Sequence, residues 1–174
     1  MKNWVYFVIA VIFYLLIHEG LHAFMALLFN EYETIKIHWY GPEVLFATPV
    51  PERTSEIKWF LISGVSNLTT ILIGYMLFIN KEKFINHRLS SLRGILYYAT
   101  IVFLLFDAIN LSIGPFFYGG DINGISTGLK LKAWIIQILF GAILIFNRKL
   151  IIKLMRQFGI KTSNILFKPW YREL

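Results

Sequence analysis

The chain of 174 residues contains no cysteine. A disulfide framework, a thiolate metal site and a cysteine nucleophile are therefore excluded, and any metal ion must be held by histidine or carboxylate side chains. Charged residues are scarce at 16%, whereas 57% of the residues are hydrophobic and the mean hydropathy is +0.62. This composition excludes an ordinary soluble domain and predicts a polytopic membrane protein.

Linker-like and repetitive sequence is missing as well. No Ser/Pro/Gly-rich linker, low-complexity tract or internal repeat divides the chain, so we predict a single membrane-embedded domain over residues 1–174. The net charge of +7 is compatible with nucleic-acid binding, but the basic residues lie at the ends of apolar runs and in residues 147–174. That distribution favours the headgroups of a lipid bilayer as the partner, and no nucleic acid.

Long apolar runs predict an all-α fold of about four transmembrane helices. They cover approximately residues 4–29, 57–79, 92–114 and 133–146. The fourth run is short for a span and needs flanking residues whose lysines snorkel. Residues 147–174 are basic and are predicted to form a C-terminal tail, an amphipathic helix that lies on the cytoplasmic surface of the membrane.

A short β-hairpin is predicted between the first and second helices. Two β-prone segments, 34–40 and 43–48, flank the pair Gly41-Pro42, which we expect to form the turn. A second irregular region is expected after the third helix, because residues 116–124 are rich in glycine and follow Pro115. Irregular backbone at this depth is tolerated only where it lines protein or a wet cavity.

The distribution of basic residues predicts an orientation. With four spans, the N-terminus, residues 81–93 and the C-terminal tail share one side, which holds 12 of the 17 lysines and arginines. The positive-inside rule then predicts that both termini lie in the cytoplasm of a multi-pass protein of the cell membrane. The hairpin and the segment after the third span are then predicted on the non-cytoplasmic side.

The most informative stretch is His18-Glu19-Gly20-Leu21-His22, which lies inside the first apolar run. On a helix, His18 and His22 are one turn apart and project from the same face, so both imidazoles can reach one metal ion. Glu19 lies about 100° around the helix, where its carboxylate can contact a water at the metal. Ionisable groups cost about 3 kcal/mol each within a span. Their retention at this spacing predicts a zinc site.

A catalytic zinc site needs a third protein ligand. The other histidines, His38 and His87, lie in polar segments and are expected at the surface. The chain has two aspartates. Asp121 lies in the glycine-rich segment after Pro115 and is the favoured third ligand, while Asp107 lies deep in the third span. Asp107 is open to three interpretations: a ligand, a partner of a ligating histidine, or a hydrogen bond between helices.

The sequence resembles the site-2 protease family of intramembrane zinc metalloproteases over most of its length. Three ordered blocks carry the resemblance: His18 to Ala23, then the hairpin and the segment from Pro49 to Asn67, then Asn110, Pro115 and Asp121. Val65 and Ile122 depart from the proline and the glycine usual in the second and third blocks, and Asn110 and Asp121 are unusually far apart.

The resemblance implies a zinc metalloendopeptidase that hydrolyses peptide bonds in or near transmembrane segments of a membrane-embedded peptide or protein. It implies Zn2+ held by His18, His22 and Asp121, Glu19 as general base, and Asn110 as a hydrogen-bond donor to the substrate or the oxyanion. The family usually opens its site toward the cytosol, in contrast to the orientation that the basic residues predict.

One alternative function is a non-proteolytic membrane protein that binds or carries a divalent metal through the same histidines, with Asp107 as an intramembrane relay. Such a carrier has little need of a glutamate directly after the first histidine, and no repeated half is visible. A second alternative is a catalytically dead regulator of the same fold. The intact His18, Glu19 and His22 argue against it.

Overall fold

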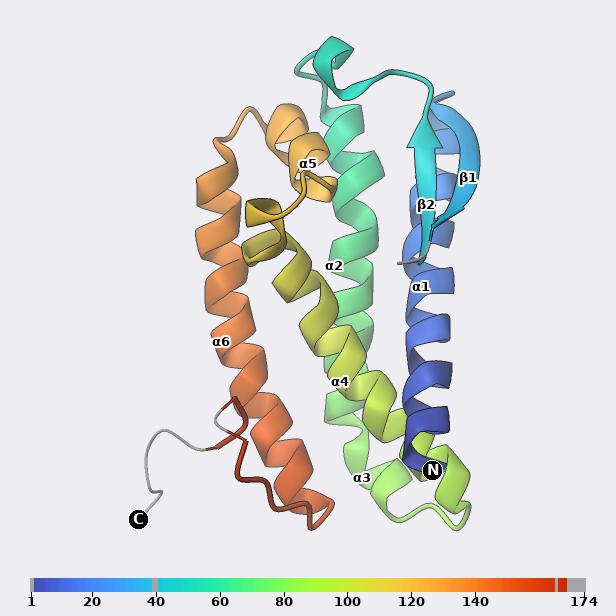
Figure 1. Cartoon of the computed structure of the whole chain (residues 1–174), viewed down its shortest axis with the longest axis vertical. Helices are drawn as coiled ribbons and strands as arrows, with labels where there is room; N and C mark the ends of the chain where they lie inside the picture. Colours follow the sequence, from blue (N-terminus) through green and yellow to red (C-terminus); the bar gives the residue numbers. More distant parts are fainter. Residues whose placement is uncertain (1, 39–40, 165, 169–174) are drawn as a thin grey trace.

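The computed structural model describes residues 2–38, 41–164 and 166–168, and in this part four helices are long and apolar enough to cross a membrane (Figure 1). These helices are α1 (Lys2–Leu28), α2 (Ile57–Ile79), α4 (Ser90–Ser112) and α6 (Ala133–Gln157). The prediction of an all-α membrane protein with about four spanning helices and one hairpin is confirmed. Most of α1 faces outward, with Phe13 and Leu16 more than half exposed, as expected of a helix that contacts lipid.

Helix α4 is the centre of the bundle, because it contacts each of the other three long helices. Against α1 it buries a cluster that includes Ala10, Tyr14 and Phe103. A second cluster joins α2, α4 and α6 around Ile71, Leu111 and Phe140. Small residues such as Ala10 let the helices approach closely, which is how helices associate where lipid removes the usual hydrophobic drive.

Helix α6 is longer than the sequence suggests. The apolar run ends at Phe146, but the helix continues to Gln157, so the separate surface-lying helix expected from residue 147 is not seen in residues 147–157. The reason is a second buried stripe at helical spacing, formed by Asn147, Ile151 and Leu154, each 0% exposed. Basic side chains such as Lys153 occupy the other face.

The hairpin consists of β1 (Tyr32–His38) and β2 (Gly41–Phe46), which pair antiparallel. Gly41 and Pro42 lie in β2, opposite His38 and Ile37, so the expected turn at Gly41-Pro42 is corrected. The reversal falls between residues 38 and 41, and residues 39–40 lie outside the described part. Proline is tolerated at an outer edge of a two-stranded sheet because no ladder hydrogen bond is lost there.

A buried carboxylate fastens the hairpin to the bundle. Glu31, just after α1, accepts a hydrogen bond from the Thr48 N–H at 3.2 Å and pairs with Lys58 Nζ of α2 at 3.0 Å. Burial by itself raises the pKa of Glu31, but these two partners outweigh it and hold the pKa below its usual range. Arg53 completes the link by stacking over the Trp59 ring, 4.3 Å from its centroid.

In the described residues, short helices connect the long ones: η1 (Val50–Glu52), α3 (Lys81–Ile85), η2 (Gly114–Phe116) and α5 (Asp121–Leu129). Helix α5 replaces part of the irregular segment expected over residues 116–124. It lies directly against α2, because Gly128 has no side chain and a methyl group there would overlap the Phe60 main chain. Gly120, which precedes the helix, has φ +62°, a conformation that favours glycine.

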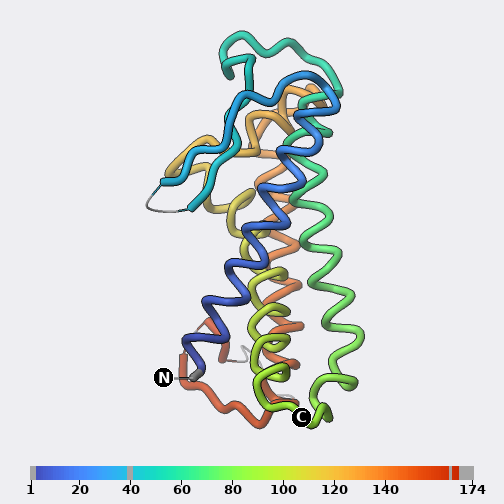
Figure 2. The backbone as a smooth tube through the Cα atoms, turned by 90° about the vertical axis from the view of Figure 1, so that its right-hand side faces the viewer, coloured from blue at the N-terminus to red at the C-terminus, as the bar shows by residue number. Residues whose placement is uncertain are grey.

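The bundle has two distinct ends. Figure 1 shows the start of α1, helix α3 and the end of α6 at one end, and the hairpin and α5 at the other. Figure 2 shows the hairpin and the segment between α4 and α5 projecting from the same side of the bundle. The hairpin and the segment between α4 and α5 therefore lie on the same side of the bundle. His18 and His22 belong to the half of α1 nearer to the hairpin.

Candidate metal centre

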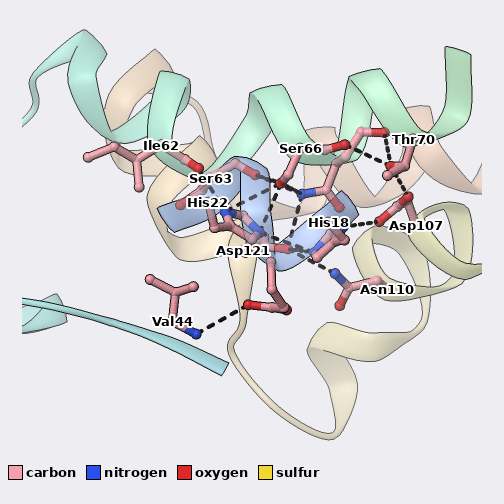
Figure 3. Close-up of polar contacts among 12 residues, drawn as sticks. His18, His22, Val44, Ile62, Ser63, Ser66, Thr70, Asp107, Asn110 and Asp121 are labelled. Atoms are coloured by element: carbon pink, nitrogen blue, oxygen red, sulfur yellow. Dashed lines mark hydrogen bonds and ion pairs between the residues drawn. The ribbon is translucent and has the colours of Figure 1, made fainter. Parts of the chain in front are cut away.

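The two histidines of α1 point into the bundle toward α2 (Figure 3). His18 is 5% exposed and His22 is 3% exposed, and their Nε2 atoms lie 3.1 Å apart. The helical spacing of four residues puts both side chains on the same face of α1. This face contacts α2 and α4, so both side chains are buried in the bundle. The pair predicted from the sequence is thus brought together.

Asp121 is the first residue of α5, and it faces both histidines. Its Oδ1 lies 3.2 Å from His22 Nε2, and its Oδ2 lies 3.4 Å from His18 Nε2. Burial by itself raises the pKa of Asp121, but the imidazoles of His22 and His18 outweigh it and hold the pKa well below its usual range. The side chain is therefore a carboxylate at neutral pH.

These three side chains have the donor atoms and the proximity that a metal site requires. Two ligand atoms on a tetrahedral zinc ion, each about 2.0–2.2 Å from it, are about 3.3–3.6 Å apart. The two Nε2 atoms are 3.1 Å apart, Oδ1 lies 3.2 Å from His22 Nε2 and Oδ2 lies 3.4 Å from His18 Nε2, at or slightly below this range. Among the described residues, His18, His22 and Asp121 form the one group of three such side chains within metal-binding distance of one another.

The remaining nitrogen of each imidazole has a partner of its own. His22 Nδ1 lies 2.7 Å from the main-chain carbonyl oxygen of Ile62, which can only accept a hydrogen bond. His18 Nδ1 lies 3.1 Å from Asp107 Oδ1. A ring that donates through Nδ1 presents the lone pair of Nε2, and the two Nε2 atoms are the ones that face Asp121. Asp107 thus lies behind His18 and outside the group of ligand atoms.

Polar side chains of α2 form the wall behind the ligands. Asn67 is 0% exposed and its Nδ2 donates to Asp121 Oδ2 at 3.0 Å and to the Ser63 carbonyl at 2.7 Å. Ser66 Oγ lies 2.9 Å from His22 Nε2. The sequence alone did not predict that these residues line the candidate site. The signal was present, because Ser63, Ser66, Asn67 and Thr70 are buried polar residues at helical spacing within a span.

Glu19 and Asn110 are the two predicted catalytic residues. Glu19 is partly buried, and its Oε2 accepts a hydrogen bond from the Val44 N–H of β2 at 3.2 Å. Asn110 Nδ2 donates to Asp121 Oδ2 at 3.1 Å, and its Oδ1 accepts from the Tyr118 hydroxyl at 3.0 Å. Asn110 therefore contacts one of the three clustered side chains directly, through one of the two hydrogens of its amide group.

The other two histidines lie apart from the centre. His38 is on the hairpin, where its Nε2 lies 3.2 Å from Glu43 Oε2. His87 lies near α3 at the opposite end of the bundle, where its Nδ1 accepts a hydrogen bond from the Leu89 N–H at 3.1 Å. Both are partly buried, and neither belongs to the group formed by His18, His22 and Asp121.

No protein-family model, curated protein or solved structure matches this chain.

Proposed function

We propose that this protein is a zinc metalloendopeptidase of the site-2 protease kind, which hydrolyses peptide bonds in or near transmembrane segments. One observation carries the proposal: the two Nε2 atoms lie 3.1 Å apart, and each lies 3.2–3.4 Å from an oxygen of the Asp121 carboxylate, Oδ1 for His22 and Oδ2 for His18, with Glu19 directly after the first histidine. A glutamate directly after the first of two such histidines is the arrangement in which zinc hydrolases place their general base.

The residues of the chain divide the chemistry among them. His18, His22 and Asp121 hold the ion, which when bound supplies a Lewis acid and acidifies water. Glu19 accepts the proton of the attacking water and passes it to the leaving amine. The Val44 N–H at 3.2 Å keeps the Glu19 carboxylate turned toward the hairpin side of the site. Asn110 donates its free amide hydrogen to the oxyanion or to the substrate backbone.

The surroundings of the site favour a membrane-embedded peptide or protein as the substrate. The histidines lie in a helix whose other faces are apolar and exposed, so a substrate meets them from within the bilayer. A substrate helix must unwind locally before its amides can be attacked. The hairpin lies beside Glu19, and an extended substrate segment can add to its edge as a further strand. We place the protein in the cell membrane.

The test has two parts. We expect purified wild-type protein to contain about one zinc ion per chain by mass spectrometry of the metal, and His22→Ala and Asp121→Ala to contain little. We expect wild type in liposomes to cleave at least one member of a set of fluorogenic transmembrane peptides, and Glu19→Gln to bind zinc normally but lose roughly 10²–10⁴-fold in rate.

A wild-type protein without zinc contradicts the proposal, and so does a Glu19→Gln variant that cleaves at the wild-type rate. The same liposomes distinguish a peptidase from the alternative, a metal carrier, by a measurement of zinc transport. A carrier moves zinc into sealed liposomes and keeps that activity in Glu19→Gln, whereas a peptidase does not.

A further inference from the structure

A carboxylate behind the metal centre takes no part in binding the ion or in the chemistry described above. Asp107 lies in the spanning part of α4 and is 0% exposed. Three groups from two other helices surround it: the Tyr14 hydroxyl and His18 Nδ1 of α1, and the Thr70 hydroxyl of α2. An acidic group inside a membrane span is costly unless each of its oxygens has a donor.

We propose that Asp107, Tyr14 and Thr70 form a positioning unit that holds the His18 imidazole with its hydrogen on Nδ1 and its Nε2 lone pair toward the metal. The proposal rests on the zinc site proposed above and extends it to residues that do not touch the ion. It assigns a role to the second aspartate of the chain.

The donors and acceptors around His18 Nδ1 determine which ring nitrogen carries the hydrogen. The Tyr14 hydroxyl has one hydrogen and donates it to Asp107 Oδ1 at 2.6 Å. Its oxygen, 3.3 Å from His18 Nδ1, can then only accept. Asp107 Oδ1, at 3.1 Å from the same nitrogen, is also an acceptor. With acceptors on both sides, Nδ1 carries a hydrogen, and Nε2 of the neutral imidazole then presents its lone pair.

The unit also fixes the plane of the ring. The Tyr14 ring stacks on His18, with centroids 5.3 Å apart and planes inclined by 26°. The Thr70 hydroxyl donates to Asp107 Oδ2 and so fixes the rotation of the carboxylate from the side of α2 (Figure 3). The His18 ring is therefore held by one contact face-on and by one hydrogen bond at its edge.

A carboxylate on the far nitrogen changes the ligand itself. It makes the imidazole a stronger donor and offsets positive charge where little water is present to do so. The two histidines differ in this respect, because His22 Nδ1 is held by the neutral Ile62 carbonyl at 2.7 Å. A side-chain substitution can remove the partner of His18, but none can remove the main-chain partner of His22.

The competing explanation is that Asp107 only joins three helices. Asn147 provides a matched control, because it is also 0% exposed and its Nδ2 donates to the Leu104 carbonyl of α4 at 2.6 Å, away from the histidines. Both positions join helices through a buried polar side chain. Only Asp107 contacts a metal ligand, so zinc affinity separates the two explanations and thermal stability does not.

The experiment measures the zinc dissociation constant of the purified full-length chain in detergent by competition with a chromophoric chelator, with the thermal midpoint of the metal-free protein recorded in parallel. We expect Asp107→Asn to raise the dissociation constant about 10–100-fold. Tyr14→Phe and Thr70→Val are expected to raise it less. Asn147→Ala is expected to lower the thermal midpoint and leave the dissociation constant unchanged.

Wild-type zinc affinity in Asp107→Asn overturns the proposal while the metal site stands. If Asp107→Asn does not fold, wild-type affinity in both Tyr14→Phe and Thr70→Val overturns it. A wild-type protein that binds no zinc refutes the proposed function and this inference together. A chain that binds zinc tightly, weakens in Asp107→Asn and cleaves no peptide supports the inference and refutes the peptidase.

Discussion

At the scale of single residues, each ligand of the proposed zinc site is oriented by a second contact. Asp121 carries two such contacts, from Asn67 Nδ2 at 3.0 Å and from Asn110 Nδ2 at 3.1 Å, both to Oδ2. Oδ1 receives neither of these amides and lies 3.2 Å from His22 Nε2. The two amides thus favour one rotamer of the carboxylate, in which Oδ1 stays near the histidine.

The first prediction at this scale concerns Asn110. Because its amide touches Asp121 directly, we expect Asn110→Ala to raise the zinc dissociation constant by roughly tenfold as well as to slow cleavage. Chelator competition on the purified protein measures the first effect. A residue that served only the substrate would leave zinc affinity untouched, and that result would return Asn110 to the oxyanion role alone.

At the scale of elements, the site depends on how closely α5 approaches α2. Asp121 comes from a nine-residue helix that follows a glycine with φ +62°. This helix contacts α2 through positions where a side chain has no room, Gly124 against Ser63 and Gly128 against Phe60. The carboxylate reaches the histidines only while α5 stays in this position.

The prediction at this scale is that a single methyl group on α5 weakens the metal site. Gly128→Ala places a methyl group against the main chain of Phe60, which cannot rotate away. Overpacking of this kind costs about 1–3 kcal/mol. Zinc binding requires α5 in its original position, so this free energy is subtracted from the free energy of zinc binding. Zinc affinity is then expected to fall about 5–150-fold.

The control for this prediction is Gly141→Ala on α6, where a methyl group meets nothing nearer than Ser112 Cβ at 4.0 Å. Alanine is the better helix former, so we expect wild-type zinc affinity and equal or slightly higher stability in that variant. Equal zinc affinities in the two variants would show that the position of α5 does not govern the site.

At the scale of the whole molecule, the two ends differ in charge and in the elements that they carry. The start of α1, helix α3 and the end of α6 share one end, and this end carries most of the basic residues. The hairpin and α5, whose first residue Asp121 belongs to the candidate metal centre, lie at the other end. An asymmetry of this kind orients a multi-pass protein, because basic segments resist translocation.

Orientation can be tested cleanly because the chain contains no cysteine. We expect Glu52→Cys, at an exposed site beside the hairpin, to react with a membrane-impermeant maleimide in intact cells. Lys161→Cys, exposed beyond α6, is expected to react only after the cells are permeabilised. Labelling in the reverse order would place the metal centre toward the cytoplasm and contradict the orientation that the basic residues predict.

Much of the fold was predictable because it depends on local properties. The lengths of the apolar runs set the four spans, and α2 coincides with the predicted residues 57–79. The end of α6 was not predictable in this way. Its last turns are held by Asn147, Ile151 and Leu154 packing into the bundle, and hydropathy cannot show which side of a basic helix faces a partner.

The candidate site likewise has a part that depends on local sequence and a part that depends on tertiary packing. The sequence by itself determined the pair His18 and His22 with Glu19 beside it, because residues four apart on a helix share a face whatever surrounds them. Only the tertiary structure decided that Asp121 meets the pair, that Asp107 stands behind His18, and that Asn67 and Asn110 hold Asp121. These contacts join residues far apart along the chain, and such contacts arise from the packing of α1, α2, α4 and α5.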